Sequence, residues 1–304
     1  MASLLQTALE LGFISSLTVL ALYLSYSMLD VCDLSTDGAF TLGACVGAVV
    51  AISGHPYLSI LAAMLAGVLS GFVTAILQTK MGIDSLLAGI VVNTGLYSIN
   101  IAVMGNSSLL NMNKTETVFT KLKAVLENTP LKEQYKMIVA LLAVVIICAL
   151  LITLLRTRLG LAIRATGNNL AMVRSSSINT SVITIIGLCI SNSFTGLSGC
   201  LLAQYNKSVN IDIGTGMLTI ALASLLIGRM FFKKRGTAFG AVGAVIGACV
   251  FRVIYTLALR FNMPAYLLKL ISSLIVIIAI SGPYFQSHYA AERKRKQLRG
   301  GVHE

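Results

Sequence analysis

Long runs of apolar residues recur along the chain, separated by shorter polar stretches. A helix that crosses the roughly 30 Å hydrocarbon core of a bilayer needs about 20 such residues, and only helices or closed barrels satisfy their backbone groups there. The pattern predicts an all-α, polytopic membrane helix bundle of about 8–9 spans, of which the seventh and the second are short. The predicted helices lie at about residues 5–29, 39–53, 57–78, 82–104, 137–155, 181–203, 217–231, 237–258 and 266–282.

The composition supports a membrane bundle with no soluble part. Of the 304 residues, 56% are hydrophobic and only 11% are charged, and the mean hydropathy is +0.86. Such a chain cannot be hidden in one soluble core. We therefore expect residues 1–304 to form a single transmembrane domain.

The residue types that carry catalytic or metal chemistry are scattered. The six cysteines show no CxxC spacing, and the three histidines, His55, His288 and His303, lie in loops or the tail and form no HExxH pair. No nucleophile and base can be assembled from the intramembrane residues. We expect no metal site, no cofactor and no catalytic residue, which disfavours a membrane-embedded enzyme.

Basic residues orient the bundle, because loops rich in Lys and Arg stay in the cytoplasm. They concentrate in the loop 156–180, in the turn 229–235 and in the tail 284–304, whereas the polar stretch 105–136 mixes lysines with glutamates and fits the outer face. Counting through the spans puts the N-terminus outside and the C-terminus in the cytoplasm. The net charge of +12 then needs no nucleic acid, since the basic clusters can meet anionic lipid or a cytoplasmic partner.

Two short, glycine-rich spans have similar polar beginnings: DLSTDGAFTLGACVGAVV from Asp33 and DIGTGMLTIALASLLIG from Asp212. In the predicted topology the first follows an inward-going span and the second an outward-going one. The two halves would then be inverted-topology repeats, in which paired short helices point to a transport pathway. The free N–H groups at the start of such helices suit an anionic group such as a carboxylate. Ordinary polar turns between helices explain the match equally well.

Several polar residues lie within apolar context and are candidates for lining the pathway. Acids at such a depth are costly unless they are solvated or paired. The alternative for each residue is an interhelical hydrogen bond that holds the bundle together. The candidates are Asp33, Ser35, Thr36, Asp37, Asn93, Thr94, Ser191 and Asn192.

The segment LGLAIRATGNNLAMVRSSSINT, from Leu159 to Thr180, is a basic insert between two apolar runs. It holds good helix formers and a GNN break, which predict a helix–turn–helix on the inner face. Its arginines would project into the cytoplasm, and its apolar side chains would form a docking surface. Those side chains are Leu161, Ala162, Leu170, Ala171 and Val173.

This segment resembles the cytoplasmic coupling loop of the branched-chain amino acid/ribose-type permease family of bacterial ABC importers. The matching positions are Gly160, Ala162, Arg164, Ala165, Asn169, Ala171 and Ile178–Asn179. Ser177 stands where the family has its closing glycine, so the sharpness of the turn is in question. DLSTDGAFTLGA likewise resembles the Asp-Leu-Ser motif that opens the family's second core helix.

The resemblance implies a permease of the bacterial inner membrane that pairs with a second copy and docks a cytoplasmic ABC ATPase dimer, with Arg164, Asn169 and Arg174 at the interface. ATP would be used by the partner, since the chain has no GxxxxGK[ST] loop. For Arg174, a solvated loop position is the alternative.

The chain looks most like the single-permease subgroup paired with tryptophan/tyrosine-type binding lipoproteins. That subgroup implies a small polar solute, an amino acid, delivered by an external lipoprotein. From the residues alone, a pathway lined by small polar groups fits amino acids, sugars or nucleosides. A self-contained secondary transporter remains the alternative, since inverted repeats and intramembrane acids suit it as well.

Overall fold

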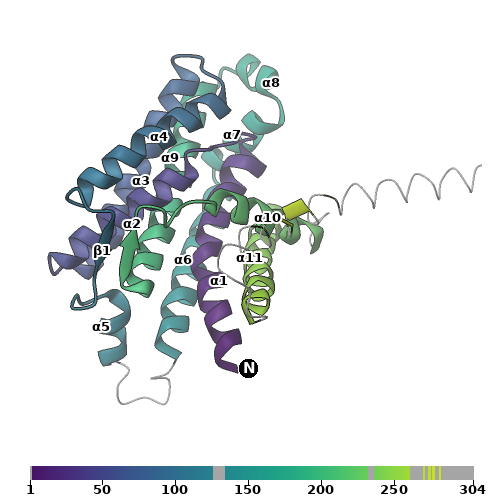
Figure 1. The fold of residues 1–304 in the computed structure, drawn as a ribbon. Helices are drawn as coiled ribbons and strands as arrows, with labels where there is room; N and C mark the ends of the chain where they lie inside the picture. Colours follow the sequence, from purple (N-terminus) through teal and green to yellow (C-terminus); the bar gives the residue numbers. More distant parts are fainter. Residues whose placement is uncertain are drawn as a thin grey trace, which may run out of the picture.

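The computed structural model describes residues 2–125, 134–231 and 236–260, together with 270, 273–274, 276–277 and 281. In this part of the chain, six helices are long and apolar enough to cross a membrane, and two further apolar helices are shorter (Figure 1). The six are α1 (Ala2–Leu22) continued by the π-helix η1 (Tyr23–Met28), α3 (Pro56–Thr79), α4 (Ser85–Val103), α6 (Tyr135–Arg156), α9 (Thr180–Asn206) and α11 (Thr237–Arg260). The shorter two are α2 (Thr36–Ile52) and α10 (Met217–Phe231).

The chain therefore forms a polytopic α-helical bundle, as the hydropathy pattern predicts. Helices lie within a few residues of eight of the predicted ranges. The ninth, 266–282, lies mostly outside the described residues. Most of the turn 229–235, part of the stretch 105–136 and the whole tail 284–304 also lie outside them. The number of spans stays a prediction.

One end of the bundle carries elements that the hydropathy pattern does not predict. Strand β1 (Leu109–Asn111) pairs with β2 (Ser208–Asn210) in antiparallel register, with Leu110 opposite Val209. The short helix α5 (Val118–Val125) follows β1. A strand of three residues is too short to show an alternating pattern. The pairing also joins segments about 100 residues apart, so the local sequence does not predict these strands. We call the end that carries this antiparallel strand pair the hairpin end, although no tight turn joins the two strands.

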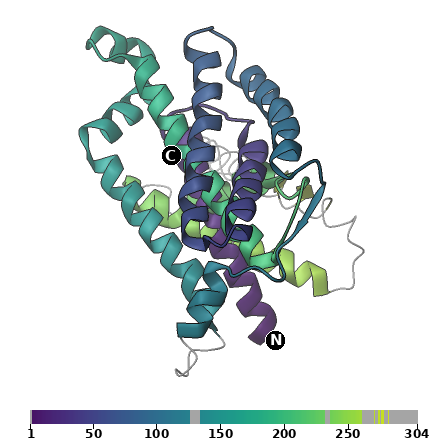
Figure 2. The ribbon, with the colours of Figure 1, turned by 90° about the vertical axis from the view of Figure 1, so that its left-hand side faces the viewer.

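The opposite end carries two short helices, α7 (Arg158–Asn168) and α8 (Leu170–Ser175). Figure 1 places them at the top and the N-terminus at the bottom, and Figure 2 shows the same separation after a quarter turn. We call this the α7–α8 end. The basic segment between two apolar helices is therefore well separated from the paired strands.

Helices α1 and α9 form the centre of the bundle. Each has a membrane-length window that is 78% buried, against 28–33% for the other four long helices. They run antiparallel, because Ser198 Oγ donates to Ile14 O (2.7 Å) and, farther toward the α7–α8 end, Ser191 Oγ donates to Ala21 O (2.8 Å). The remaining apolar faces point outward, toward lipid or a partner.

Glycines allow the central helices to pack backbone against backbone. A Cβ on Gly43 of α2 would lie 2.2 Å from Gly196 O of α9, and one on Gly67 of α3 would lie 2.2 Å from Asn192 O of the same helix. No side chain fits in such gaps. The small residues of these helices therefore serve close packing, as is usual in membranes.

The bundle contains two similar three-helix units, α1–α2–α3 and α9–α10–α11. In each, a long central helix is followed by a non-helical stretch, a short helix and a long helix. The short and third helices of each unit pack against the central helix of the other: α2 and α3 against α9, α10 and α11 against α1. Because α1 and α9 are antiparallel, the units run in opposite directions. An inverted repeat requires this arrangement, although the repeat itself stays a prediction.

Candidate functional site

The non-helical residues 29–35 lead from η1 into α2 and carry the first intramembrane acid. Asp33 is 1% exposed. Its Oδ1 accepts hydrogen bonds from the backbone N–H of Ser35 (2.8 Å) and from Ser35 Oγ (2.6 Å), and its Oδ2 accepts one from Asn192 Nδ2 of α9 (2.6 Å). A buried carboxylate is stable only when such donors satisfy it. Asp33 therefore fastens the stretch 29–35 to the central helix α9.

Other candidate pathway residues belong to the same network of contacts. Thr74 Oγ1 of α3 lies 3.2 Å from Ser35 Oγ, and Thr36 Oγ1 donates to Asp33 O at 2.8 Å. Ser191 donates from α9 to α1, as described above. In this structure the described contacts of Asp33, Ser35, Thr36, Ser191 and Asn192 are local or interhelical hydrogen bonds. Their place on a solute path stays a prediction.

The second acid, Asp37, joins the two short helices. It lies in the first turn of α2, and its carboxylate accepts the backbone N–H groups of Gly216 (2.8 Å) and Leu218 (2.7 Å) at the start of α10. The close approach depends on Gly214, where a Cβ would lie 2.2 Å from Asp37 O. A carboxylate at a helix N-terminus satisfies unpaired donors and the helix dipole. Asp37 therefore caps α10.

This geometry changes the expectation that the helix starts offer free N–H groups to a solute carboxylate. Two N–H groups at the start of α10 are bonded to Asp37, and the N–H of Ser35, the N-cap of α2, is bonded to Asp33. The sequence correctly shows two short helices with polar beginnings. It does not show that each helix start is matched with an acid of the chain itself.

A pocket of about 310 Å³ lies where α2, α4 and the stretch leading into α10 meet. It brings three of the candidate pathway residues together, Asp37, Asn93 and Thr94. Asn100, a further polar residue in an apolar run that the sequence marks as a candidate, also lines it. Sequence reasoning missed Tyr97, although Asn93, Tyr97 and Asn100 are spaced by four and three residues and so share one face of α4. The lining residues are Asp37, Gly38, Thr41, Asn93, Thr94, Tyr97, Asn100, Ile211, Asp212 and Thr215.

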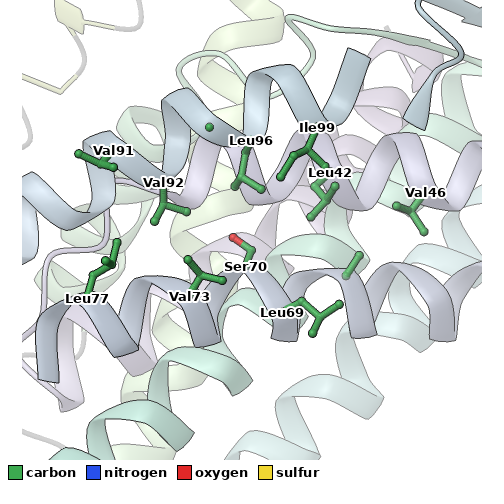
Figure 3. A pocket seen from close by; sticks show the side chains of 12 residues that line it. Leu42, Val46, Leu69, Ser70, Val73, Leu77, Val91, Val92, Leu96 and Ile99 are labelled. Carbon is green, nitrogen blue, oxygen red and sulfur yellow. The ribbon is translucent and has the colours of Figure 1, made fainter. Parts of the chain in front are cut away.

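A larger pocket, of about 450 Å³, has the opposite chemistry (Figure 3). Leu42 and Val46 of α2, Leu69 and Val73 of α3 and Leu96 of α4 face it with other apolar side chains, and Ser70 is its single polar side chain. Such a lining suits an acyl chain rather than a polar solute. The pocket at Asp37 is therefore the better candidate for a pathway.

The segment at the α7–α8 end folds as the predicted helix–turn–helix. Thr157 Oγ1 accepts the N–H of Gly160 (3.3 Å) at the start of α7, and Asn169 Oδ1 accepts the N–H of Met172 (3.0 Å) at the start of α8. Asn169 itself is extended, with φ −158°. The GNN break thus works through the side chain of Asn169, a strong N-cap residue.

Most of the predicted docking surface is exposed. Leu161 and Leu170 are 55% and 51% exposed, and Ala171 is also exposed. Met172, which the prediction did not include, is 67% exposed. Ala162 is half-buried. The prediction for Val173 is wrong: it is 3% exposed, because the short helix α8 buries this side chain while Met172 and Arg174 on either side are exposed.

The remaining coupling-loop positions divide between packing and exposure. Gly160 is buried, and a Cβ there would lie 2.3 Å from Leu154 O, so it allows the tight bend from α6 into α7. Ala165 and Arg164 are half-buried. Arg174 is exposed. Arg164 is thus less available than Arg174 for an ionic contact with a partner.

Two backbone features connect this loop to the rest of the molecule. Gly167 of α7 lies against η1, since a Cβ there would lie 2.3 Å from Met28 O. Ser177 has a φ of +60°, the left-handed conformation that glycine adopts most easily. The sharp turn at the family's closing glycine is therefore kept by a serine.

Comparison with known proteins identifies the family. The family described as "Branched-chain amino acid transport system / permease component" matches residues 4–280. The chain belongs to this permease family. The permease is accordingly a multi-pass membrane protein of a transport system and not an enzyme, in agreement with its apolar helices.

Three relatives show the range of the family. The permease is 35% identical over 268 residues to a tyrosine transport system permease protein of Clostridioides difficile, covering 88% of this chain and 86% of the relative. It is 29% identical to an uncharacterized protein of Rickettsia prowazekii over 92% and 97% of the two chains. It is 25% identical to the ribose import permease protein of Escherichia coli over 82% and 75%. No solved structure matches the permease.

Proposed function

We propose that this permease is the membrane-spanning subunit of an ABC importer that moves a small polar solute, an amino acid, into a bacterial cell. The tyrosine transport permease among its relatives supports the solute class, and the positive-inside rule supports the orientation. Residues 1–304 act as one transmembrane domain of the inner membrane. The α7–α8 end and the C-terminus lie in the cytoplasm, and the hairpin end and the N-terminus lie outside.

The α7–α8 surface carries the proposal. Leu161, Leu170 and Met172 are large apolar side chains that are each more than half exposed on a basic, water-facing loop, with Arg174 exposed beside them. Several large apolar side chains exposed on one short loop outside the bilayer are typical of an interaction site. An ATPase dimer that docks on two copies of the permease would cover it, and the adjoining arginines would pair with acidic side chains of the motor.

Motion would pass from α7 to the pocket along one continuous segment. Gly167 lies against Met28, the last residue of η1, and a π-helix within a helical span is a frequent site of adjustment. From there the chain runs through Asp33 to Asp37, whose carboxylate holds the start of α10. Rotation of α7 would thus shift both short helices, alternating access to the pocket between the two sides.

The permease makes and breaks no bond in this scheme and needs no cofactor of its own. ATP is used by the partner subunits. A binding lipoprotein would deliver the solute at the hairpin end, and lipid would cover the outward apolar faces of the long helices. No nucleic acid takes part.

Affinity purification in mild detergent tests the proposal. The wild-type permease should retain an ATPase and a lipoprotein. Met172→Glu should lose the ATPase, because it replaces the most exposed of these apolar side chains, at 67%, with a charge. Leu109→Glu is the matched control: Leu109 is 59% exposed, but it lies on β1 at the other end of the bundle.

Two results would contradict the proposal. One is equal ATPase retention by Met172→Glu and Leu109→Glu in samples with the same amount of folded permease. The other is transport in proteoliposomes by the permease alone, without ATP, which would indicate a secondary transporter.

A further inference from the structure

We infer that the pocket at Asp37 binds the ammonium group of the transported solute. This inference rests on the proposed function, and it narrows the solute to molecules that bring hydrogen-bond donors and a positive charge. Two observations support it: the charged residues that line the pocket are acidic, and one buried hydrogen-bond acceptor there has no donor among the described residues.

The charged residues of the pocket are all acidic. Asp37 and Asp212 line it, and none of its ten lining residues is Lys, Arg or His. Asp37 uses its carboxylate to cap α10, but each carboxylate oxygen has a second lone pair. Asp212 is exposed, and its side chain has no hydrogen-bond partner among the described residues. The pocket therefore holds a negative charge without a counterion from the same lining.

Asn100 gives independent evidence for a missing donor. It is 1% exposed, and its Oδ1 is buried and has no hydrogen-bond partner among the described residues. Its Nδ2 donates to Gly38 O at 3.4 Å, which fixes the direction of the amide, because the opposite direction would bring two oxygens together. An unpaired buried acceptor is costly, and a ligand donor would remove that cost.

The two observations favour an ammonium group over other parts of a solute. An ammonium carries three donors and one positive charge, which matches two carboxylates and one amide oxygen. A carboxylate would meet two like charges, and the neighbouring helix N-termini are already bonded to acids of the chain. The volume of about 310 Å³ lies at the small end of ligand sites, and the half-exposed ring of Tyr97 borders it.

The test measures binding to the purified permease in nanodiscs by saturation-transfer NMR, without the lipoprotein that would otherwise select the solute. The probes are L-tyrosine, tyramine, 3-(4-hydroxyphenyl)propionate and ribose. The first three share a phenol ring and differ in their charged groups. We expect tyrosine and tyramine to bind and the other two not to bind.

Variants at Asp212 then locate the binding. Asp212→Asn should weaken amine binding roughly tenfold or more, as for the loss of one charge-assisted bond, and Asp212→Lys should abolish it. Glu116→Gln is the matched control, because Glu116 is an acid outside the pocket that pairs with Lys121 at 3.4 Å.

The outcomes separate this inference from the proposed function. Equal binding of tyramine and the propionate, absence of amine binding, or equal affinity of Asp212→Asn and Glu116→Gln would overturn the ammonium assignment, even where the ATPase co-purifies. If the wild-type permease retains no ATPase but still binds amines selectively, the importer proposal is overturned and the assignment of the pocket stays in place.

Discussion

Asp33 and Asp37 stand four residues apart on one segment, yet their carboxylates do different work. Asp33 is sealed inside the bundle, where Ser35 and Asn192 satisfy it. Asp37 holds the first N–H groups of α10 and borders a pocket with Asp212. One acid joins the segment to the central helix α9, and the other joins it to the second short helix, α10.

This difference shows that an acid within a membrane segment is not by itself evidence of a solute path. Both residues are of one type, at neighbouring positions, and both are costly at that depth without partners. The hydrogen-bond partners decide the role of each acid. Asp33, held by Ser35 and by Asn192 of the central helix, is structural, and we call these contacts the Asp33 lock. Asp37, held by backbone N–H groups at a helix start, leaves room for a ligand. The comparison can be tested by changing each acid and its contacts in turn, from the largest expected effect on stability to the smallest.

The largest effect is expected from Asp33→Asn. The new amide NH₂ group would point either at the N–H of Ser35 or at Nδ2 of Asn192. In both cases two hydrogen-bond donors would meet in a buried site without an acceptor. We expect the free energy of unfolding to fall by about 3 kcal/mol. The decrease is measured as a loss of thermal stability in detergent, monitored by size-exclusion chromatography after heating. Asp30→Asn is the control, since Asp30 is exposed and its φ of +57° is one that Asn tolerates. Equal stability of the two variants would contradict the lock.

A smaller loss of stability and a larger loss of transport are expected from Asp37→Asn. The amide can accept only one of the two N–H groups that the carboxylate holds, so the cap on α10 weakens by about 1 kcal/mol. Uptake into proteoliposomes that also contain the ATPase, with ATP and the lipoprotein supplied, should fall roughly tenfold per folded permease, because the pocket loses a charge. A decrease in uptake no greater than the decrease in folded protein would show that Asp37 is only structural.

The smallest effect is expected from Thr74→Val, which removes the hydroxyl beside Ser35. The free energy of unfolding should fall by about 1 kcal/mol, the value of one hydrogen bond, while uptake per folded permease stays unchanged. Thr79→Val on the same helix is the matched control, because among the described residues its hydroxyl bonds only to Ala75 O (2.7 Å) of the same helix. Reduced uptake in Thr74→Val but not in Thr79→Val would place the Asp33 lock on the solute path.

The helices could be predicted from the sequence and the small sheet could not. A membrane helix bonds its own backbone, so a run of apolar residues is sufficient evidence for it. The pairing of Leu110 with Val209 depends on two segments meeting at the hairpin end, and neither segment has a pattern of its own. The same holds for Val173, whose burial depends on how α8 lies on the bundle.

The site divides in the same way. The break at Asn169 could be predicted because an N-cap acts on residues two or three positions away. The positive φ of Ser177 could not, since a serine gives no local signal for it. Asn93 and Thr94 were found from their polar character in an apolar run, whereas the pocket partner Asp212 follows from the meeting of two distant helix starts.

Sequence by itself determined that this chain is a membrane bundle of α-helices with a basic helix–turn–helix between two spans. The bilayer imposes a requirement that each segment meets alone, about 20 apolar residues with internally bonded backbone. Only the tertiary structure decided what each acid does. Asp33 meets Asn192 across 159 residues, and Asp37 meets Gly216 across 179, because a buried carboxylate takes whichever donors the packed helices bring within reach.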